Sequence, residues 1–343
     1  MEQNLFGNKP VVVTGASGLL GVHLCIALIS KGVQVRAIIR NEHSKNKAEH
    51  IFALYSVLPH ELLLIEWRYA DITNFQDVCD VLQDVAYVFH CAGYVSFHDS
   101  DRDTLHAINV LGTQYVVDAC LQFGITKLCH VSSVAAIGKA VGSDFIDETC
   151  EYEPKKSRSL YGYSKYLGEL EVWRGIAEGL PAVIVNPSII IGFGSKEQSS
   201  ASLFYTMSRG MPFYTSGITG YVSVHDVVDS MIMLMKSDIS AERFIVSAEN
   251  LSYKTIFTCI AQSLGVSVPR YYVPSWVLHS VGIIATFVSF LRGSRSKITR
   301  HTAQTAYRIS QYSSQKLVHA ISFSFRNVCD EISRIGKIYK ELK

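Results

Sequence analysis

Short apolar runs alternate with longer amphipathic stretches through about the first 190 residues of the chain. The apolar runs predict strands at 10–14, 34–40, 62–67, 87–91, 127–132 and 182–186. The stretches between them predict helices at 19–31 and near 47–58, 74–83, 105–123 and 160–178. Continuous apolar strands separated by helices are typical of a parallel sheet that is covered on both faces. The pattern therefore predicts an α/β fold built on a doubly wound parallel sheet.

The alternation of strand and helix patterns becomes less regular beyond Pro187, and glycine and serine recur through residues 192–220. Two further strands are predicted at 221–224 and 244–246, on either side of a helix at 226–236. The rest of the chain is mostly helical in pattern. We therefore expect a smaller C-terminal region that covers the open end of the sheet.

A glycine-rich turn follows the first predicted strand. The segment Thr14-Gly15-Ala16-Ser17-Gly18-Leu19-Leu20-Gly21 opens directly into the first predicted helix. Gly15 allows a tight turn, Gly18 lets the backbone approach a pyrophosphate, and Gly21 permits close packing of helix on strand. The helix N-terminus adds unpaired N–H groups and a positive dipole end for the phosphates. In this position the turn predicts a Rossmann-type dinucleotide site, with a glycine turn that serves packing alone as the alternative.

The residues after the second predicted strand bear on the choice of nicotinamide cofactor. A carboxylate there would accept the ribose hydroxyls, but this strand ends in Arg40, with Lys47 shortly after. An arginine suits a 2′-phosphate and offers no acceptor to a pair of hydroxyls. We therefore expect NADP(H) to be preferred, while Glu42 lies close enough to keep NAD(H) open. Asp71, just after the third predicted strand, is placed to meet the adenine.

Tyr-x-x-x-Lys occurs four times, at Tyr152/Lys156, Tyr161/Lys165, Tyr312/Lys316 and Tyr339/Lys343. Joint chemistry needs both side chains on one helical face, and a proline inside the first pair disfavours a helix there. The last two pairs lie late in the chain. No predicted strand end precedes them with a serine that could complete a site. The pair Tyr161/Lys165 opens the helix after the strand that ends in Ser132-Ser133. This strand end lies at the carboxyl edge of the sheet, where such folds bind ligands, so position selects the second pair.

The selected pair is suited to acid–base chemistry. A free phenol titrates near pH 10, and the Lys165 ammonium together with a cationic nicotinamide ring would lower that pKa. A lowering of about three units takes roughly 4 kcal/mol. We expect Tyr161 to give a proton to a carbonyl oxygen as hydride arrives, and Ser133 to hydrogen-bond that oxygen. Lys165 would also anchor the nicotinamide ribose, and Asn109 would hold backbone or water in a proton relay.

These residues lie in segments that resemble the extended short-chain dehydrogenase/reductase family, within the NAD-dependent epimerase/dehydratase superfamily, over nearly the whole chain. The segments are TGASGLLG, ADITN, HCAGYVSF, NVLGT, HVSSVAAIG, YGYSK, NPSIIIGFG and YVSVHDVVDS. The resemblance places Ser133, Tyr161 and Lys165 at catalytic positions. It places Pro187 and Ser188 in a segment that lines the nicotinamide. Further dinucleotide contacts are expected from Ser17, Leu19, Leu20, Ile72, Cys91, Ala92 and Gly93.

Within this family the chain is most similar to the dihydroflavonol-4-reductase and 3-beta-hydroxysteroid dehydrogenase branch. Ile137 stands where sugar-nucleotide epimerases usually carry tyrosine, and Gly192-Phe193-Gly194 replaces the commoner Gly-Pro-Gly. The resemblance implies an oxidoreductase that interconverts a carbonyl and a secondary alcohol on a small organic molecule. The apolar C-terminal helix suits a hydrophobic substrate, and buried helix packing explains it equally well. Two alternatives stay open: a nucleotide-sugar epimerase or dehydratase that keeps NAD tightly bound, and a non-catalytic NADP(H)-sensing protein. The intact serine, tyrosine and lysine argue against the sensor.

The predicted domain organisation follows from these motifs. Residues 1–187, with 221–247 returning to them, are expected to form the dinucleotide-binding Rossmann domain. Residues 188–343 are expected to form a mostly helical substrate-binding region.

Composition narrows the function further. The 343 residues carry 32 basic and 30 acidic side chains, a net charge of +2, so no strong field points to nucleic acid. The eight cysteines show no metal-ligand spacing, so we expect no metal and reduced, buried cysteines of a cytoplasmic protein. The N-terminus has no apolar signal region, and secretion is not expected.

The stretch from Tyr271 to Leu291 contains no charged side chain and raises the question of a membrane. Polar and apolar positions there form separate helical stripes, which favours an amphipathic helix over a spanning one. Membrane contact through 273–291 is therefore the less favoured interpretation. The sequence leaves open whether the protein forms a homodimer.

Overall fold

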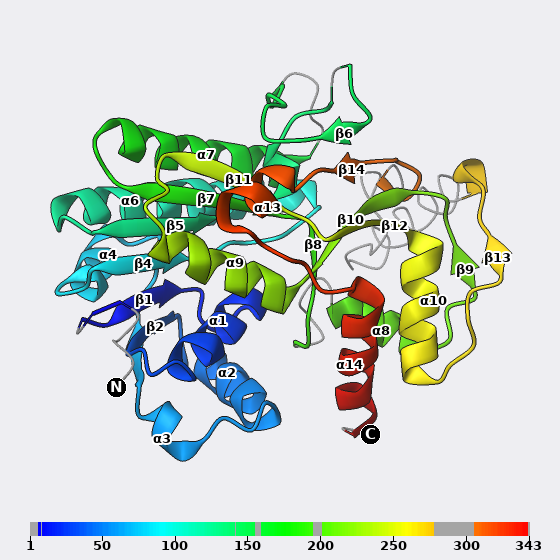
Figure 1. Cartoon of the computed structure of the whole chain (residues 1–343), viewed down its shortest axis with the longest axis horizontal. Coiled ribbons are helices and arrows are strands. Elements are labelled where there is room, and N and C mark those ends of the chain that lie inside the picture. Colours follow the sequence, from blue (N-terminus) through cyan, green and yellow to red (C-terminus); the bar gives the residue numbers. More distant parts are fainter. Residues whose placement is uncertain are drawn as a thin grey trace.

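A seven-stranded parallel sheet forms the centre of the computed structural model, which describes residues 6–7, 9–140, 142–154, 159–194, 201–277 and 305–341 (Figure 1). The strand order is β11-β7-β5-β4-β1-β2-β3. The strands are β1 (Val11–Thr14), β2 (Val35–Ile39), β3 (Ile65–Tyr69), β4 (Tyr87–His90), β5 (Lys127–Val131), β7 (Ala182–Pro187) and β11 (Glu242–Val246). Every neighbouring pair in this sheet is parallel, which confirms the predicted doubly wound fold.

Both faces of the central strands of this sheet are buried, and this explains why those strands are apolar without alternation. Val11 and Val13 belong to the core on one face, whereas Val12 belongs to the core on the other. The first core is shared with α1 (Leu19–Ile29), α2 (Glu42–Leu54) and α9 (Val224–Lys236). The second core is shared with α4 (Phe75–Leu82), α6 (Gly112–Gln122) and α7 (Leu160–Ala177). Figure 1 shows these two sets of helices on opposite sides of the strands.

Two predicted elements are shifted in the structure. The third strand begins at Ile65 rather than at residue 62, because residues Pro59–Leu62 form the short helix α3. The second helix begins at Glu42 rather than near residue 47, because the Asn41 side chain caps it and accepts the Ser44 N–H at 3.0 Å.

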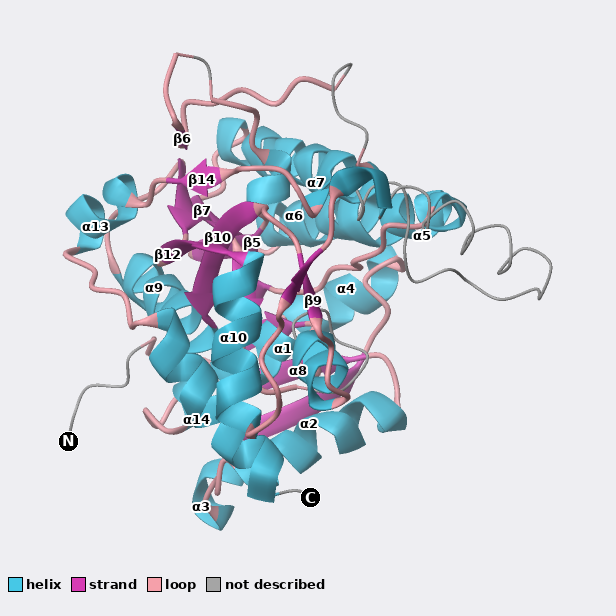
Figure 2. Ribbon diagram, turned by 90° about the vertical axis from the view of Figure 1, so that its right-hand side faces the viewer, coloured by secondary structure: helices cyan, strands magenta, loops and turns pink. Residues whose placement is uncertain are grey.

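The C-terminal part adds smaller elements at one end of the central sheet (Figure 2). Its strands are β8 (Ile189–Ile191), β9 (Phe213–Tyr214), β10 (Ile218–Ser223), β12 (Glu249–Ser252), β13 (Tyr271–Tyr272) and β14 (Gln311–Tyr312). They form a three-stranded sheet β12-β10-β8, a pair β13-β9, and a pair of β14 with β6 (Phe145–Ile146). The helices are α8 (Ala201–Ser208), α10 (Tyr253–Leu264), α13 (Gln315–Ile321) and α14 (Val328–Glu341). A third apolar core joins α8, α10 and α14.

Helices α10 and α14 are also joined by a disulfide between Cys259 and Cys329, whose Cα atoms lie 5.7 Å apart. The expectation of reduced cysteines is therefore wrong for this pair. It could not be read from the sequence, because the two residues are 70 positions apart and meet only when the helices pack. Of the six free cysteines, Cys91 and Cys150 are partly exposed and the other four are buried.

The membrane question is answered only in part. Among the described residues, no helix is long and apolar enough to cross a bilayer. Most of the stretch 273–291 lies outside the described residues.

Candidate active site

The glycine turn after β1 packs so closely that two of its glycine positions leave no room for a Cβ atom. Gly15 has a positive φ of 65°, and a Cβ there would lie 2.7 Å from the Ala92 Cα. A Cβ on Gly21 would lie 2.2 Å from the Gly15 carbonyl oxygen. Gly18 stands at the N-cap of α1, and no side chain caps the helix. No side chain therefore occupies the N-terminus of α1, a position that favours an anion, and the pyrophosphate contact stays a prediction.

A buried hydrogen-bonded chain fixes the ends of β1 and β4 beside this turn. The Thr14 hydroxyl lies 2.8 Å from His90 Nδ1 and accepts the Ala92 N–H at 3.1 Å. The other ring nitrogen of His90 lies 3.1 Å from the Thr113 hydroxyl. Burial, with a smaller effect of the Lys165 charge, lowers the pKa of His90 to about 3, so its ring is neutral. This chain orders the segment Cys91–Gly93, which the sequence assigns to cofactor contacts.

The residues assigned to the adenosine end lie at the ends of β2 and β3. Arg40 is exposed directly after β2, and Lys47 is partly exposed on α2. The carboxylate of Glu42 is engaged by the Tyr69 hydroxyl and lies 3.7 Å from Lys45. Asp71 is exposed, and one of its oxygens accepts the Thr73 N–H at 2.9 Å within its own turn. Its neighbour Ile72 is buried.

Ser133, Tyr161 and Lys165 come together at the carboxyl end of β5. Ser159 caps α7 by accepting the Gly162 N–H at 3.0 Å, and this starts the helix just before Tyr161. The Ser133 hydroxyl hydrogen-bonds the Tyr161 phenol and accepts the Ala135 N–H at 3.1 Å. The Lys165 ammonium donates to the Val131 carbonyl oxygen at 2.7 Å.

The protonation of this group differs from the expectation in one respect. Burial raises the pKa of Tyr161 above its usual value, and the hydrogen bond from Ser133 only opposes this rise. The predicted lowering of that pKa by Lys165 is therefore not found among the side chains. Burial in turn lowers the pKa of Lys165 to about 8, with the Glu169 carboxylate opposing the change. Desolvation, which the sequence does not show, is the largest cause of both pKa shifts.

Asn109 holds backbone, as expected, and lies in a π-helical turn at Ala107–Leu111. Its side-chain oxygen accepts the Tyr94 N–H at 2.8 Å, and its amide nitrogen donates to the Tyr94 carbonyl at 2.9 Å. The same nitrogen donates to the Ser164 hydroxyl at 2.9 Å. Asn109 thereby ties the segment after β4 to α7. A Cβ on Gly93 would lie 3.7 Å from Lys165 Nζ, so the two segments meet beside the lysine.

Pro187 and Ser188 follow at the end of β7, where both are buried. The Ser188 N–H donates to the Val246 carbonyl at 3.1 Å. Its hydroxyl is buried and has no hydrogen-bond partner among the described residues. An unpaired buried hydroxyl at this strand end fits a bound polar group.

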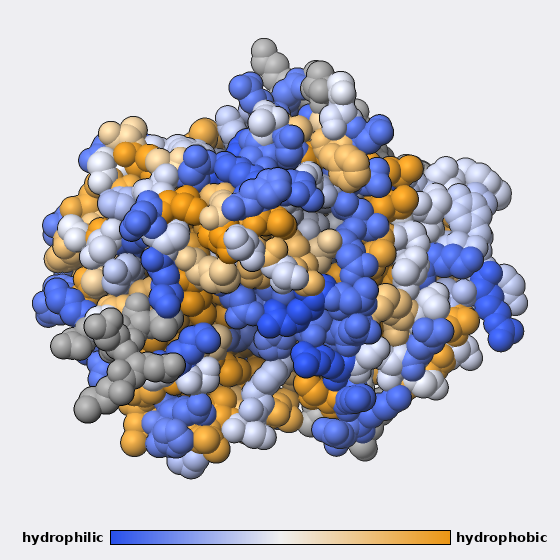
Figure 3. Space-filling model, viewed as in Figure 1, coloured by the Kyte–Doolittle hydropathy of each residue, from blue (hydrophilic) through white to orange (hydrophobic). Residues whose placement is uncertain are grey.

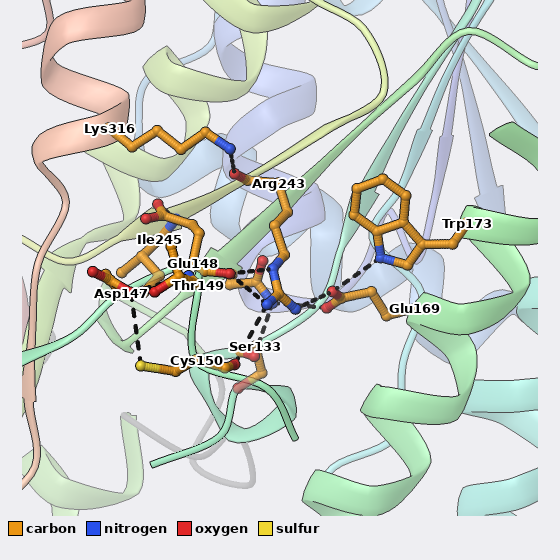
Figure 4. Close-up of polar contacts among 11 residues, drawn as sticks. Ser133, Asp147, Glu148, Thr149, Cys150, Glu169, Trp173, Arg243, Ile245 and Lys316 are labelled. Carbon is orange, nitrogen blue, oxygen red and sulfur yellow. Dashed lines mark hydrogen bonds and ion pairs between the residues drawn. The ribbon is translucent and has the colours of Figure 1, made fainter. Parts of the chain in front are cut away.

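A buried ion pair that sequence reasoning missed lies behind the Ser133 segment (Figure 4). Glu169 is only 2% exposed, and its carboxylate pairs with Arg243 at 3.0 Å. The Trp173 N–H approaches the same oxygen at 3.4 Å. Arg243 also donates to the carbonyl of Glu148 at 3.1 Å, so it joins β11 to the loop after β6.

Asn186 links this ion pair to the candidate site. Its amide donates to the Glu169 carboxylate at 2.9 Å and to the Ser133 carbonyl at 3.1 Å. Through Asn186, the Glu169 carboxylate therefore orients the backbone of Ser133. The same carboxylate counteracts the lowering of the Lys165 pKa by burial. One signal in the sequence could have found it: Glu169 stands four residues after Lys165, on the same face of the helix.

A parallel doubly wound sheet with an open glycine turn after β1 and a serine, tyrosine and lysine group after β5 defines an enzyme of the extended short-chain dehydrogenase/reductase class. Residues 11–246 match the model of the NAD dependent epimerase/dehydratase family, and the chain belongs to this family.

Named relatives agree with this assignment. The chain is 28% identical over 277 residues to sterol demethylase protein B of Methylococcus capsulatus, covering 80% of each chain. It is 27% identical over 280 residues to dihydroflavonol 4-reductase of Dianthus caryophyllus, covering 78% of this chain and 76% of the relative. The crystal structure of gox2253 superposes with a TM-score of 0.79 at 25% identity, covering 98% of this chain and 99% of the other.

Proposed function

We propose that this chain is an NADP(H)-preferring oxidoreductase that interconverts a carbonyl and a secondary alcohol on a hydrophobic organic substrate. The observation that carries the proposal is the meeting of Ser133, Tyr161 and Lys165 at the end of β5, near the glycine turn. Relatives that are named reductases support the reaction class.

Each residue of this group has a distinct role in the proposed reaction. The dinucleotide, when bound, supplies the hydride for reduction or accepts it in oxidation. Tyr161 gives its phenolic proton to the substrate oxygen in reduction and takes a proton back in oxidation. Ser133 donates a hydrogen bond to that oxygen, and Lys165 holds the nicotinamide ribose. Because burial raises the pKa of Tyr161, the phenol stays protonated at neutral pH, which suits reduction.

The residues present fit a dinucleotide. The open N-terminus of α1 receives the pyrophosphate, and the unpaired Ser188 hydroxyl lies at the strand end assigned to the nicotinamide. Asn109 keeps the segment after β4 in place through the Tyr94 backbone. The proposed cofactor contacts come from Gly15, Ser17, Gly18, Leu19, Leu20, Gly21, Asp71, Ile72, Cys91, Ala92, Gly93, Tyr161, Lys165, Pro187 and Ser188.

The proposed preference for NADP(H) rests on the charges after β2. Arg40 is exposed there, and Lys47 lies one to two turns into α2. Both suit a 2′-phosphate. The nearby acid, Glu42, is engaged by Tyr69 and Lys45, which leaves it less suited to bind ribose hydroxyls.

The proposed substrate is hydrophobic because apolar side chains lie near the proton donor. The ring of Phe97 lies 5.9 Å from the ring of Tyr161, and both Phe97 and Val95 are exposed. In the proposed arrangement, residues 1–187 and 221–247 hold the dinucleotide, and residues 188–343 supply the remaining substrate contacts.

The test is to supply the purified chain with NADPH or NADH and a panel of aldehydes and ketones, and to measure its bound nucleotide. We expect turnover of external NADPH with at least one carbonyl, about tenfold better than with NADH. Tightly bound NAD with no turnover of external NADPH would favour a nucleotide-sugar epimerase or dehydratase. NADPH binding without turnover of any substrate would favour the sensor.

A further inference from the structure

Two facing pairs of aromatic rings, followed in the sequence by an exposed tryptophan, lie in the C-terminal part, at the edge where Figure 1 places β13. Strands β9 and β13 pair in parallel, so that Tyr271 lies opposite Phe213 and Tyr272 lies opposite Tyr214. The facing rings are 6.2 Å and 5.9 Å apart. Trp276 follows four residues after Tyr272 in the sequence. We call Phe213, Tyr214, Tyr271, Tyr272 and Trp276 the aromatic face.

This face is open to solvent to an unusual degree. The exposed fractions are 51% for Phe213, 63% for Tyr271, 49% for Tyr272 and 71% for Trp276. Single exposed apolar residues are ordinary, but neighbouring large ones indicate a surface of interaction. The region appears pale rather than strongly hydrophobic in Figure 3, because tyrosine and tryptophan have intermediate hydropathy. Such side chains combine an apolar body with a polar tip.

Three cations lie beside the described residues of the aromatic face. Lys254 Nζ lies 4.9 Å from the ring of Tyr214, and exposed Arg270 directly precedes Tyr271. Exposed Arg308 is held nearby, because its neighbour Tyr307 donates a hydrogen bond to the Val273 carbonyl at 2.8 Å.

The sequence keeps acids away from the same region. Residues 250–329 contain nine lysines and arginines and not one aspartate or glutamate, although the whole chain is almost neutral at +2. Two of the nine are paired with acids from other segments: Lys316 with Glu242, and Arg326 with Asp226 and Asp229. Residues 198–225, which include β9, also contain no acid. Such a local excess of one sign indicates attraction to a negatively charged partner.

We propose that the aromatic face docks this protein on the surface of an anionic lipid bilayer. Tyrosine and tryptophan prefer the level of the lipid headgroups, and nearby lysine and arginine are attracted to anionic lipid. The proposed contact is with the bilayer surface, and among the described residues no helix is long and apolar enough to span a bilayer. Docking does not depend on the proposed reaction, although it would bring the protein to the phase in which hydrophobic substrates dissolve.

Binding of the full chain to vesicles tests the proposal directly. The probes are vesicles of phosphatidylcholine alone and of phosphatidylcholine with phosphatidylglycerol, in a sedimentation or flotation assay at low and high salt. We expect at least about tenfold tighter binding to the anionic vesicles, and weaker binding as salt increases. Failure to bind anionic vesicles at low salt would overturn the proposal.

Two double variants separate the contributions of rings and charges. Tyr271→Ser with Trp276→Ser, and Lys254→Glu with Arg270→Glu, should each weaken binding at least about tenfold. The matched control is Leu63→Ser with Lys31→Glu, which removes an exposed apolar side chain and a cation elsewhere and should bind as the unaltered chain does. Thermal unfolding identifies any variant that does not fold, and the lipid and salt series on the unaltered chain then decides.

Other acidic partners give a different outcome. If RNA or heparin binds as tightly as the anionic vesicles, and the ring variant leaves all binding unchanged, the face is a general cation surface. That result would overturn the proposal of a lipid partner.

Discussion

The glycine turn after β1 and the buried polar group behind Ser133 support the same site in opposite ways. The turn works by what is absent: at Gly15 and Gly21 any side chain would meet backbone atoms at 2.7 Å and 2.2 Å. The polar group works by what is present, since the buried Glu169 carboxylate is bound by both Asn186 and Arg243. The comparison indicates that the proposed phosphate end is fixed by backbone shape, and the proposed proton-transfer end by buried charge.

The largest expected effect follows from removing the cation of the buried pair. Arg243→Met leaves the Glu169 carboxylate buried without its partner, and we expect a loss of about 3–5 kcal/mol in the free energy of unfolding. Urea denaturation measures it. The double variant Arg243→Met/Glu169→Met, which removes both charges of the pair, should recover at least half of the loss. A single variant as stable as the unaltered chain would mean that the pair is not what fixes this end.

At the other end, Gly21→Ala should act through backbone contact alone. The added Cβ would meet the Gly15 carbonyl oxygen, and we expect a loss of about 2–3 kcal/mol together with loss of dinucleotide binding. Gly18→Ala is the control for stability, since its Cβ would lie 3.2 Å from the same oxygen. Equal unfolding free energies for the two variants would contradict the claim that close backbone contact at Gly21 fixes the turn.

The pKa of Lys165 gives a test by pH. Burial lowers this pKa from 10.5 to about 8, so between these values the unfolded chain holds the proton that the folded chain has lost. Stability should therefore rise with pH in this window, by about 2 kcal/mol from pH 7.5 to 9.5. The comparison is the difference between the unaltered chain and Lys165→Met, measured by denaturation at both pH values. If this difference does not change with pH, the lysine is not desolvated.

The smallest expected effect concerns cofactor choice. Arg40→Glu should lower kcat/KM with NADPH about tenfold relative to NADH, because it replaces the cation proposed for the 2′-phosphate with a carboxylate. Steady-state kinetics with both cofactors measures the ratio. An unchanged ratio would place the selectivity elsewhere.

The same difference explains which features the sequence could predict and which it could not. Continuous apolar strands and the glycine turn are local patterns, so they predict the parallel sheet and the turn after β1. The ion pair between Glu169 and Arg243 joins residues 74 positions apart, and no local pattern records it. The Cys259–Cys329 disulfide is hidden in the same way.

Protonation is the other part that the sequence does not show. The spacing of Tyr161 and Lys165 predicts that they lie near one another, but not how deeply they are buried. Burial raises the pKa of the phenol and lowers that of the amine, so both groups shift toward their neutral forms. The spacing therefore predicts which residues meet, whereas the direction of the Tyr161 pKa shift depends on burial.

The most direct test of the account measures NADPH affinity and the single-turnover rate of hydride transfer on the same preparation of Tyr161→Phe. Phenylalanine keeps the ring and removes the proton, so we expect NADPH to bind within about twofold of the unaltered chain. The rate of reduction should fall about 10²–10⁴-fold. An unchanged rate with intact binding would contradict the assignment of Tyr161 as the proton donor.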